Sequence, residues 1–454
     1  MTKQQRILFI SYHFPPSAAI GGQRIANFAI HLPSYGWMPH IVTIDDKNIE
    51  HLDLDRLRGL DELRIYKASV LPTPIKILSS IRDTFLKFSR VRQTPDIAKT
   101  ASPDDKKSAR TESLRRRLKR YLLSFLVLPD FQNGWIPTAT VTALLKVRQL
   151  GIDWIITSCP PYSAHVIGLA VKSLTGRLWA ADFRDPWMTA DPKSKLPMSA
   201  LSIRIERWLE RKVVEKSDLV IFNVERLMDA YRERYNHVPA EKFVYIPNGI
   251  TSRALETTTL AETYEKFTLT YTGSLYAGRS PEPVFQAISQ LIQENQVAPH
   301  TVSIKLIGHC RSVEGVPIAD LISQYGLDSS VEVWDPLPYA EALEIVRRSH
   351  IALLFAPNLP YQIPAKVYDY LGTGSRILAI AEEGGSADLV RETGSGQAFL
   401  PNDIEGIKQF IIGEMGSQKS AKSDMSYALV RFNARRITED LVTNMDRAGK
   451  RSLS

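Results

Sequence analysis

One short run of residues combines two carboxylates, a guanidinium and an indole: Asp182-Phe183-Arg184-Asp185-Pro186-Trp187. The run follows an apolar stretch that predicts a buried strand, and parallel α/β sheets bind ligands at the carboxyl ends of their strands. Side chains of these types at a strand end are typical of an active site. We predict that Asp182, Arg184 and Asp185 are catalytic. An Asp–Arg pair that only braces a turn is the alternative.

Two further loops carry glycines where a chain must come close to a ligand. Gly21 and Gly22 precede a predicted helix, whose first backbone amides can approach a phosphate. Gly273 and Ser274 follow another predicted strand, and the guanidinium of Arg279 in the same loop suits phosphate oxygens. Neither GxGxxG nor GxxxxGK[ST] occurs, so these loops match no nicotinamide-cofactor or P-loop fingerprint.

Lys366 and Asp369 are three residues apart, so both would lie on one face of a helix. Lys366 suits a diphosphate, and Asp369 suits the vicinal hydroxyls of a ribose. A salt bridge between the two side chains is the alternative interpretation. Gly385 lies in another glycine-rich entry to a predicted helix. These residues complete the predicted nucleotide-binding site, which consists of Gly21, Gly22, Gly273, Ser274, Arg279, Lys366, Asp369 and Gly385.

The apolar pattern predicts a scaffold that brings such loops together. Short apolar runs alternate with stretches of helical spacing, beginning with a β–loop–α–β unit, and the pattern restarts in the second half. We therefore predict an α/β protein of two Rossmann-like, doubly wound parallel-sheet domains that face each other across a cleft. The predicted strands are 7–11, 40–44, 154–157, 178–181, 219–222, 268–272, 303–307, 331–333, 351–355 and 376–380.

A long helix is predicted over 199–216. Its apolar positions recur at helical spacing and form a stripe along the helix. The stripe consists of Leu201, Ile205, Leu209 and Val213.

The length supports two domains, because a single hydrophobic core rarely grows beyond about 250–300 residues and the chain has 454. Asn248-Gly249 predicts a turn, and a polar, threonine-rich stretch follows it. We predict domains over 1–248 and 249–430, with a C-terminal helix over 431–454 that packs back toward the first domain. A basic insertion at about 70–130 interrupts the first domain, and its polar part, 93–111, is expected to be mobile.

Composition excludes some classes of site. The two cysteines, Cys159 and Cys310, belong to no CxxC or Cys/His cluster, so no metal centre is expected. The net charge of +8 suits an anionic partner, which could be a nucleic acid, an anionic membrane or a phosphorylated ligand, or it is a solvated surface. The N-terminal apolar run is too short for a signal peptide, and no stretch approaches the roughly 20 apolar residues of a membrane span. We expect a cytoplasmic protein.

Two segments mix basic and apolar residues, 75–91 and 114–128. Such segments can lie on an anionic membrane surface. The alternative is a helix that packs on the domain and leaves its arginines in solvent. The basic residues of the second segment are Arg115, Arg116, Arg117, Lys119 and Arg120.

In this order and spacing, the motifs resemble those of bacterial family 4-type (group 1) retaining glycosyltransferases with the B-type double-Rossmann fold (GT-B). The resemblance covers nearly the whole chain except about residues 50–130. The motifs include SYHFPPSAAIGGQR at 11–24, ADFRDPW at 181–187, IPNGI at 246–250, TGSLYAGR at 272–279 and IPAKVYDYLGTGSRILAI at 363–380.

The resemblance implies roles for several residues. It places the nucleotide-sugar donor mainly on the C-terminal domain and the acceptor mainly on the N-terminal one, with Arg279 and Lys366 on the donor diphosphate. Asp369 stands where the family has the second of two glutamates, which contacts the ribose, and Tyr361 stands where the first would be. Arg184 takes the place of a catalytic-loop histidine found in many relatives. Ser274 takes the place of the arginine in a typical Gly-Arg-Leu.

The expected function is therefore transfer of a sugar from a nucleotide-sugar donor, with retention at the anomeric carbon and without a metal or cofactor. The expected acceptor belongs to cell-surface polysaccharide or glycolipid synthesis, and is either lipid-linked or soluble. Nucleic acid is not an expected partner. A sugar-nucleotide epimerase on the same fold is one alternative. A catalytically degenerate binding or scaffold protein, suggested by Tyr361 and Ser274, is the other.

Overall fold

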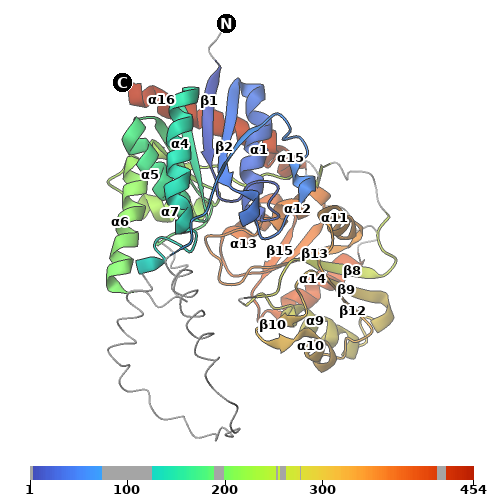
Figure 1. Ribbon diagram of the computed structural model, residues 1–454. Helices are drawn as coiled ribbons and strands as arrows, with labels where there is room; N and C mark the ends of the chain where they lie inside the picture. Colours follow the sequence, from blue (N-terminus) through green and yellow to red (C-terminus); the bar gives the residue numbers. More distant parts are fainter. Residues whose placement is uncertain are drawn as a thin grey trace, which may run out of the picture. The chain divides into compact units, whose positions relative to one another are not determined.

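The computed structural model describes residues 4–73, 125–188, 199–251, 254–255, 262–276, 278–416 and 426–453 (Figure 1). The predicted membrane segment 75–91, the polar stretch 93–111 and most of 114–128 lie outside these ranges. The chain forms two compact units. The first comprises residues 1–29, 36–220 and 448–454, and the second comprises residues 30–35 and 221–447.

The first sheet has seven strands in the order β3-β2-β1-β4-β5-β6-β7. The four successive pairings β3–β2, β2–β1, β1–β4 and β4–β5 are parallel. The order reverses between β1 and β4, which makes a topological switch point where parallel sheets place their ligand sites. The strands are β1 (Gln5–Ile10), β2 (Trp37–Ile44), β3 (Arg64–Ala68), β4 (Trp154–Cys159), β5 (Leu178–Phe183), β6 (Leu219–Phe222) and β7 (Phe243–Tyr245).

Helices connect these parallel strands. α4, α5 and α6 pack side by side in chain order (Figure 1), and because parallel crossovers are right-handed they cover one face of the sheet while α1 covers the other. Gly151 and Gly176 end α4 and α5 in the left-handed conformation that glycine adopts most readily. The helices are α1 (Gln23–His31), α4 (Ile136–Leu150), α5 (Ser163–Thr175), α6 (Ala200–Lys216) and α7 (Glu225–Arg234).

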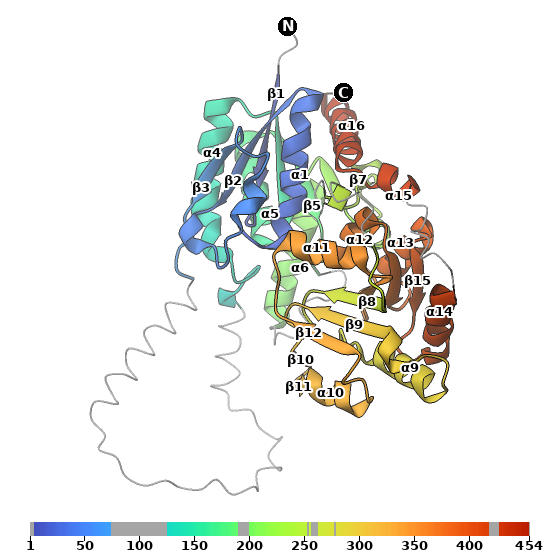
Figure 2. The same ribbon diagram turned by 90° about the vertical axis from the view of Figure 1, so that its right-hand side faces the viewer.

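The second unit contains a six-stranded sheet in the order β12-β9-β8-β13-β14-β15 (Figure 2). Every pairing in it is parallel. Its order reverses between β8 and β13, so this sheet also has a switch point. The strands are β8 (Phe267–Thr272), β9 (Val302–Ile307), β12 (Val331–Trp334), β13 (Ile351–Phe355), β14 (Arg376–Ile380) and β15 (Gly396–Phe399).

The helices of the second half complete its layers. A small hairpin of β10 (Ser312–Val313) and β11 (Val316–Pro317) follows β9. The main helices are α9 (Glu282–Gln293), α10 (Ile318–Gln324), α11 (Tyr339–Arg348), α12 (Lys366–Thr373), α13 (Gly385–Thr393), α14 (Ile404–Gly416), α15 (Ser426–Arg431) and α16 (Ala434–Leu453).

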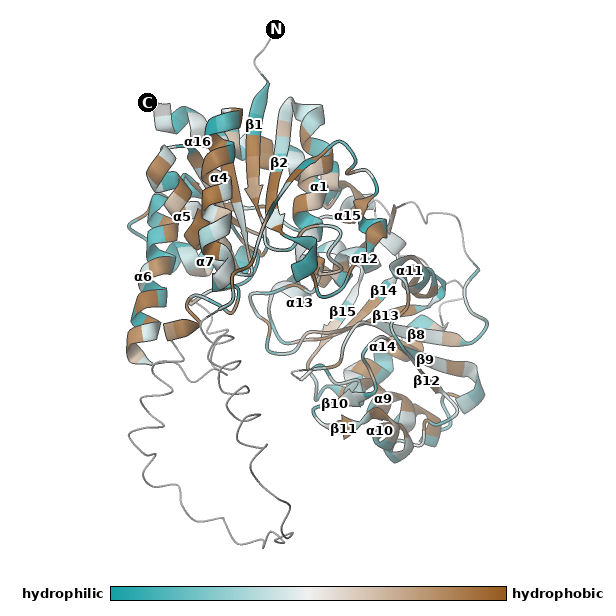
Figure 3. Ribbon diagram, viewed as in Figure 1, coloured by the Kyte–Doolittle hydropathy of each residue, from teal (hydrophilic) through white to brown (hydrophobic). Residues whose placement is uncertain are grey.

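The central strands carry the cores of both sheets. Every residue of β4, β6, β9 and β13 is buried. The neighbouring strands β1 and β2 show brown, hydrophobic stretches in Figure 3. Near-continuous apolar runs are typical of parallel strands that helices cover on both faces. The predicted fold class, with two doubly wound parallel-sheet units, is confirmed.

The helix predicted over 199–216 is present as α6, but its apolar positions do not mark its buried face. Of these four residues only Val213 is buried, whereas Leu201 is 52% exposed. The helix instead buries Glu206 and Glu210, because Trp187 Nε1 donates to Glu206 Oε2 at 2.8 Å and the Met188 amide donates to Glu210 Oε2 at 2.7 Å. Hydrogen bonds from the loop after β5 therefore decide which face of the helix turns inward.

Candidate functional site

In the first unit, Asp182 at the end of β5 is the centre of a buried polar network. Its carboxylate is fully buried and pairs with Arg24 of α1, whose Nη2 lies 3.1 Å from Asp182 Oδ1. Ser158 at the end of β4 donates to Asp182 Oδ2 at 2.8 Å. The network ties α1, β4 and β5 together beside the switch point.

Arg184, the second predicted catalytic residue, holds three backbone carbonyls. Its Nε donates to the Cys159 oxygen at 2.7 Å, its Nη2 donates to the Pro160 oxygen at 2.9 Å, and its Nη1 donates to the Gly21 oxygen. The guanidinium thereby fixes the loops that follow β1 and β4. Its positive charge stays at the carboxyl edge of the sheet.

The two glycines of the first loop are explained by close packing. A Cβ on Gly21 would lie 3.1 Å from both terminal nitrogens of Arg184, and a Cβ on Gly22 would lie 2.9 Å from the Cα of Phe14. The pair belongs to a short 3-10 turn, Ile20–Gly22, that leads into α1. The loop is therefore held against Arg184. Its predicted contact with a phosphate stays a prediction.

His13 is a functional candidate that the sequence interpretation missed. Its ring lies beside Gly21, where a Cβ would be 3.3 Å from His13 Cδ2. Burial and the nearby Arg184 charge lower the pKa of His13 to about 4, so the imidazole is neutral at physiological pH. A neutral imidazole can accept a hydrogen bond from a hydroxyl. The signal in the sequence was a histidine directly after a strand that ends at the switch point.

Asp185, the third predicted catalytic residue, is half-buried in the same loop. Its charge helps to raise the pKa of the Tyr162 phenol, although burial is the larger cause. The loop rests on an aromatic pair, in which Trp187 stacks on Tyr162 with ring centroids 4.9 Å apart. Asp182, Arg184, Asp185, Gly21 and Gly22 thus gather at the ends of β1, β4 and β5.

In the second unit, Lys366 lies against the loop that follows β8. Its ammonium donates to the Thr272 carbonyl and lies 3.9 Å from the centre of the Tyr271 ring. Gly273 has a φ of 125°, and a Cβ there would lie 2.5 Å from Lys366 Nζ. Glycine is therefore required at 273 both for the backbone conformation and for the space that the ammonium occupies.

Arg279 adds a second cation to this loop. Its guanidinium lies over the Tyr276 ring, 4.4 Å from the centroid. Burial, and after it the Arg279 charge, lowers the pKa of Lys366 to about 7. Within the part of the chain that the structure describes, neither cation forms an ion pair with a carboxylate. Two basic side chains at a strand end can bind an anion. Ser274, in the same loop, accepts a hydrogen bond from Tyr271 through its carbonyl.

Asp369 lies one turn after Lys366 on α12. Its Oδ1 accepts a hydrogen bond of 2.5 Å from the Tyr339 hydroxyl, which also lies 3.0 Å from Thr251 Oγ1. Tyr339 is a further residue that the sequence interpretation missed, since nothing in the pattern linked the start of α11 to Asp369. A carboxylate that accepts from one hydroxyl here could accept from the hydroxyls of a ribose. Tyr361 is half-buried in the loop before α12.

Gly385 is the first residue of α13 and follows Lys366 by nineteen residues in the sequence. Its amide donates to the Pro360 carbonyl at 3.0 Å, and a Cβ there would lie 2.8 Å from Val224 Cγ1. A Cβ on Gly384 would lie 2.7 Å from the Cα of Pro360. The close approach of the loop before α12 therefore explains both glycines, and a phosphate contact at Gly385 stays a prediction.

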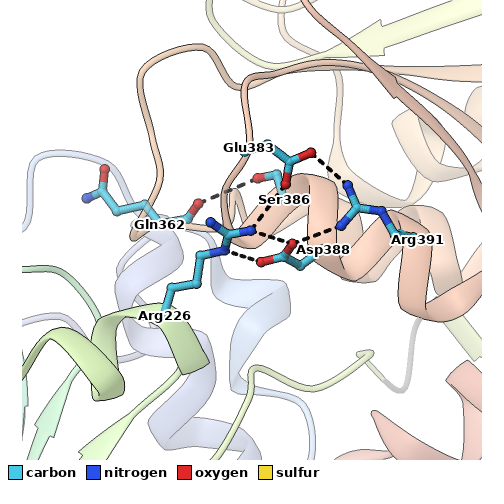
Figure 4. Close-up of polar contacts among 6 residues, drawn as sticks. All are labelled: Arg226, Gln362, Glu383, Ser386, Asp388 and Arg391. Atoms are coloured by element: carbon cyan, nitrogen blue, oxygen red, sulfur yellow. Dashed lines mark hydrogen bonds and ion pairs between the residues drawn. The ribbon is translucent and has the colours of Figure 1, made fainter. Parts of the chain in front are cut away.

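Four charged side chains surround the start of α13 (Figure 4). Arg226 of α7 donates to Asp388 and lies 3.2 Å from Glu383. Arg391 lies 2.9 Å from the same glutamate and 3.2 Å from Asp388. The two arginines and two carboxylates neutralise one another, and together they hold α13 in place.

Within the described residues, no group of three or more His, Cys, Asp or Glu side chains could hold a metal ion. Among the same residues, no helix has the length and apolar content that crossing a membrane requires.

Residues 21–249 match the model of a protein family described as the glycosyl transferase 4-like domain. No curated protein matches the chain by sequence.

Solved structures share the fold over nearly the whole chain. Sucrose-phosphate synthase from Thermosynechococcus elongatus has a TM-score of 0.62 at 15% identity and covers 98% of both chains. HepE from Anabaena, solved in complex with UDP, has a TM-score of 0.60 at 13% identity, over 98% of this chain and 100% of its own. The lipopolysaccharide outer core galactosyltransferase WaaB has a TM-score of 0.57 at 13% identity, over 99% and 100%. At these identities the likeness is one of fold.

Proposed function

The chain belongs to the glycosyl transferase 4-like family, and on that premise we propose that it moves a sugar from a nucleotide-sugar donor to an acceptor. The donor binds the second unit, at the loop after β8 and the start of α12. The acceptor binds the first unit, at the ends of β1, β4 and β5. The GT-B-type fold of the solved neighbours supports this assignment.

The observation that carries the proposal is the pair of cations Lys366 and Arg279. Sugar transfer from a nucleotide diphosphate builds negative charge on the leaving phosphate. Preorganised cations and backbone amides at that point stabilise the transition state. An anion bound beside Lys366 would raise its lowered pKa and so favour the charged ammonium. The same two cations would make a metal ion unnecessary.

UDP is the first nucleotide to test, because HepE was solved with it. Asp369 would accept from the ribose hydroxyls in competition with Tyr339. Gly273 and Ser274 would present the backbone of the loop to the diphosphate beside Lys366, whose ammonium occupies the space that a side chain at 273 would need. Gly385 at the start of α13 would contribute a backbone surface nearby in the same unit.

At the acceptor, the neutral imidazole of His13 would accept a hydrogen bond from the attacking hydroxyl. Arg184 would hold the surrounding loops and supply positive charge, and Asp185 would balance the positive charge that develops on the sugar. Asp182, which is buried against Arg24, would act as a positioning residue. We propose retention at the anomeric carbon on the strength of the family resemblance.

We further propose a cell-surface polysaccharide or glycolipid precursor as the acceptor, and a cytoplasmic protein attached to the inner face of the membrane. The net charge of +8 and the basic-apolar segments 75–91 and 114–128 support the attachment. A galactosyltransferase of the lipopolysaccharide outer core among the fold neighbours makes a glycolipid acceptor a reasonable first choice.

The test is a panel of nucleotide sugars incubated with purified protein, with and without lipid-linked acceptors. Free nucleotide that appears only with an acceptor, together with a glycosylated product, is the expected result. A changed sugar without an acceptor would show an epimerase instead. Binding of a nucleotide sugar without turnover, with every acceptor tried, would show a scaffold protein.

A further inference from the structure

We propose that the outer surface of α4, α5 and α6 is a docking face for an anionic lipid bilayer. The inference rests on the proposed function only in its choice of a lipid-linked acceptor. The proposal is based on the side chains of this face, which carries exposed basic residues together with exposed large apolar residues.

The charges on these three helices are one-sided, and the structure describes every residue of them. α4 and α5 contain no acidic residue. α6 has three acidic residues, but Glu206 and Glu210 are buried, and Glu215 is half-buried and paired with Lys212 at 2.9 Å. The exposed charged side chains on the three helices are all positive: Arg148 on α4, and Arg204, Arg207, Arg211 and Lys216 on α6, of which Arg211 lies 3.8 Å from Glu215.

Large apolar side chains stand between these cations. Trp208 on α6 is 48% exposed and Leu201 is 52% exposed. Trp208 is one turn from both Arg204 and Arg211, and Leu201 is one turn from Arg204, so these side chains lie on the same side of the helix. Val141 and Leu145 on α4 and Leu174 on α5 are also exposed, and α4 shows a run of brown residues in Figure 3.

This combination matches the interface of an anionic bilayer. Tryptophan prefers the headgroup level, leucine and valine insert below it, and arginine pairs with lipid phosphates. A purely solvated surface would explain the arginines but not a half-exposed tryptophan among them. The buried Glu206 and Glu210 explain how the face arises, because the loop after β5 draws the acidic stripe inward and turns the apolar and basic residues out.

The location suits an acceptor that stays in the membrane. α6 follows β5, so its first turn, with Leu201, lies at the edge of the sheet where β5 ends at Arg184 and Asp185. A bilayer against this face would present the headgroup of a lipid-linked acceptor near that edge.

The first test is co-sedimentation of the full chain with vesicles of phosphatidylglycerol and phosphatidylcholine, or of phosphatidylcholine alone. We expect binding only to the anionic vesicles, with loss of binding as salt rises. The variant R204E/R207E/R211E should bind on the order of 100-fold more weakly, because each basic residue contributes separately to the attraction. The control R58E/R64E/K266E removes the same charge at exposed positions elsewhere and should bind as wild type.

The second test uses acyl-brominated lipids, which quench tryptophans that reach below the headgroups. Five of the seven tryptophans are buried, which leaves Trp208 and Trp334 as the exposed ones. Quenching should persist in W334F and disappear in W208F. The inference is wrong if the two variants are quenched equally, if the arginine variant binds like its control, or if the protein binds heparin but no vesicles.

Nucleotide-sugar binding by the same variants separates this inference from the proposed function. We expect R204E/R207E/R211E to bind nucleotide sugar with wild-type affinity and to bind anionic vesicles much more weakly than wild type. Vesicle binding without any nucleotide-sugar binding by the wild type would contradict the proposed function and leave the docking face standing.

Discussion

The ammonium of Lys366 occupies the space in which a side chain on Gly273 would begin, since a Cβ there would lie 2.5 Å from Lys366 Nζ. The bare backbone at the end of β8 and the cation at the start of α12 are therefore one structural unit. Because Arg279 adds a second positive charge to the same loop, the unit has the composition of an anion site.

Binding of a nucleotide sugar should take up protons above neutral pH. Lys366 has a pKa of about 7 in the free protein, so at pH 8 most molecules carry it neutral. A diphosphate favours the charged ammonium and raises this pKa, so affinity should fall as pH rises above 7, by at most tenfold per pH unit. Calorimetry at pH 8 in two buffers of different ionisation enthalpy measures the uptake. Equal enthalpies in the two buffers would rule out a proton on Lys366.

Asp369→Asn should weaken nucleotide binding without affecting the diphosphate contacts. Loss of a charge-assisted hydrogen bond to the ribose costs about 1.5–3 kcal/mol. Inorganic diphosphate lacks the ribose and should bind the variant as it binds wild type. Tyr339→Phe serves as the control, because it leaves the carboxylate in place and removes one hydroxyl that donates to it. A similar loss of affinity for both ligands would show that Asp369 does not act through the ribose.

Asp182→Asn should act mainly on stability. The free energy of unfolding should fall, and turnover by the folded protein should not be greatly reduced. Removal of one partner of a buried ion pair leaves Arg24 uncompensated, at a cost of about 3–5 kcal/mol in the free energy of unfolding. Denaturant unfolding measures this cost. Asp55→Asn is the control, because its pair with Arg58 is exposed and should contribute less than about 1 kcal/mol. A variant of unchanged stability with greatly reduced turnover would instead make Asp182 a catalytic residue.

The sequence predicted the strands because parallel strands covered by helices are continuous apolar runs. Each predicted strand appears within about three residues of its expected bounds. The strands that were missed have weaker patterns: β3 has one buried residue in five and β15 has one in four. The apolar spacing along α6 does not indicate its buried face, because that face includes Glu206 and Glu210, which accept hydrogen bonds from the loop after β5.

The sequence pattern points to candidate residues that follow a strand or open a helix, and it does not register side chains that tertiary packing brings beside them. The motif order pointed to Lys366 and Asp369, but no pattern connected Asp369 with Tyr339, which is thirty residues earlier in the chain. The sequence also does not show that protein atoms lie where side chains on Gly22 and Gly385 would begin. Such packing depends on which loops meet, which spacing along the chain does not specify.

Lys366→Met tests the central claim most directly, because it removes the charge and keeps most of the side chain. Titration of nucleotide sugar into the variant at pH 6.5, where wild-type Lys366 is mostly charged, should show a loss of about 1.5–3 kcal/mol, roughly 10- to 150-fold in Kd. Lys305→Met is the matched control, since Lys305 is a lysine of the same unit that pairs with Glu332 at 2.7 Å, and it should bind as wild type. If folded Lys366→Met binds the nucleotide sugar as tightly as Lys305→Met, the second unit does not hold the donor diphosphate at Lys366.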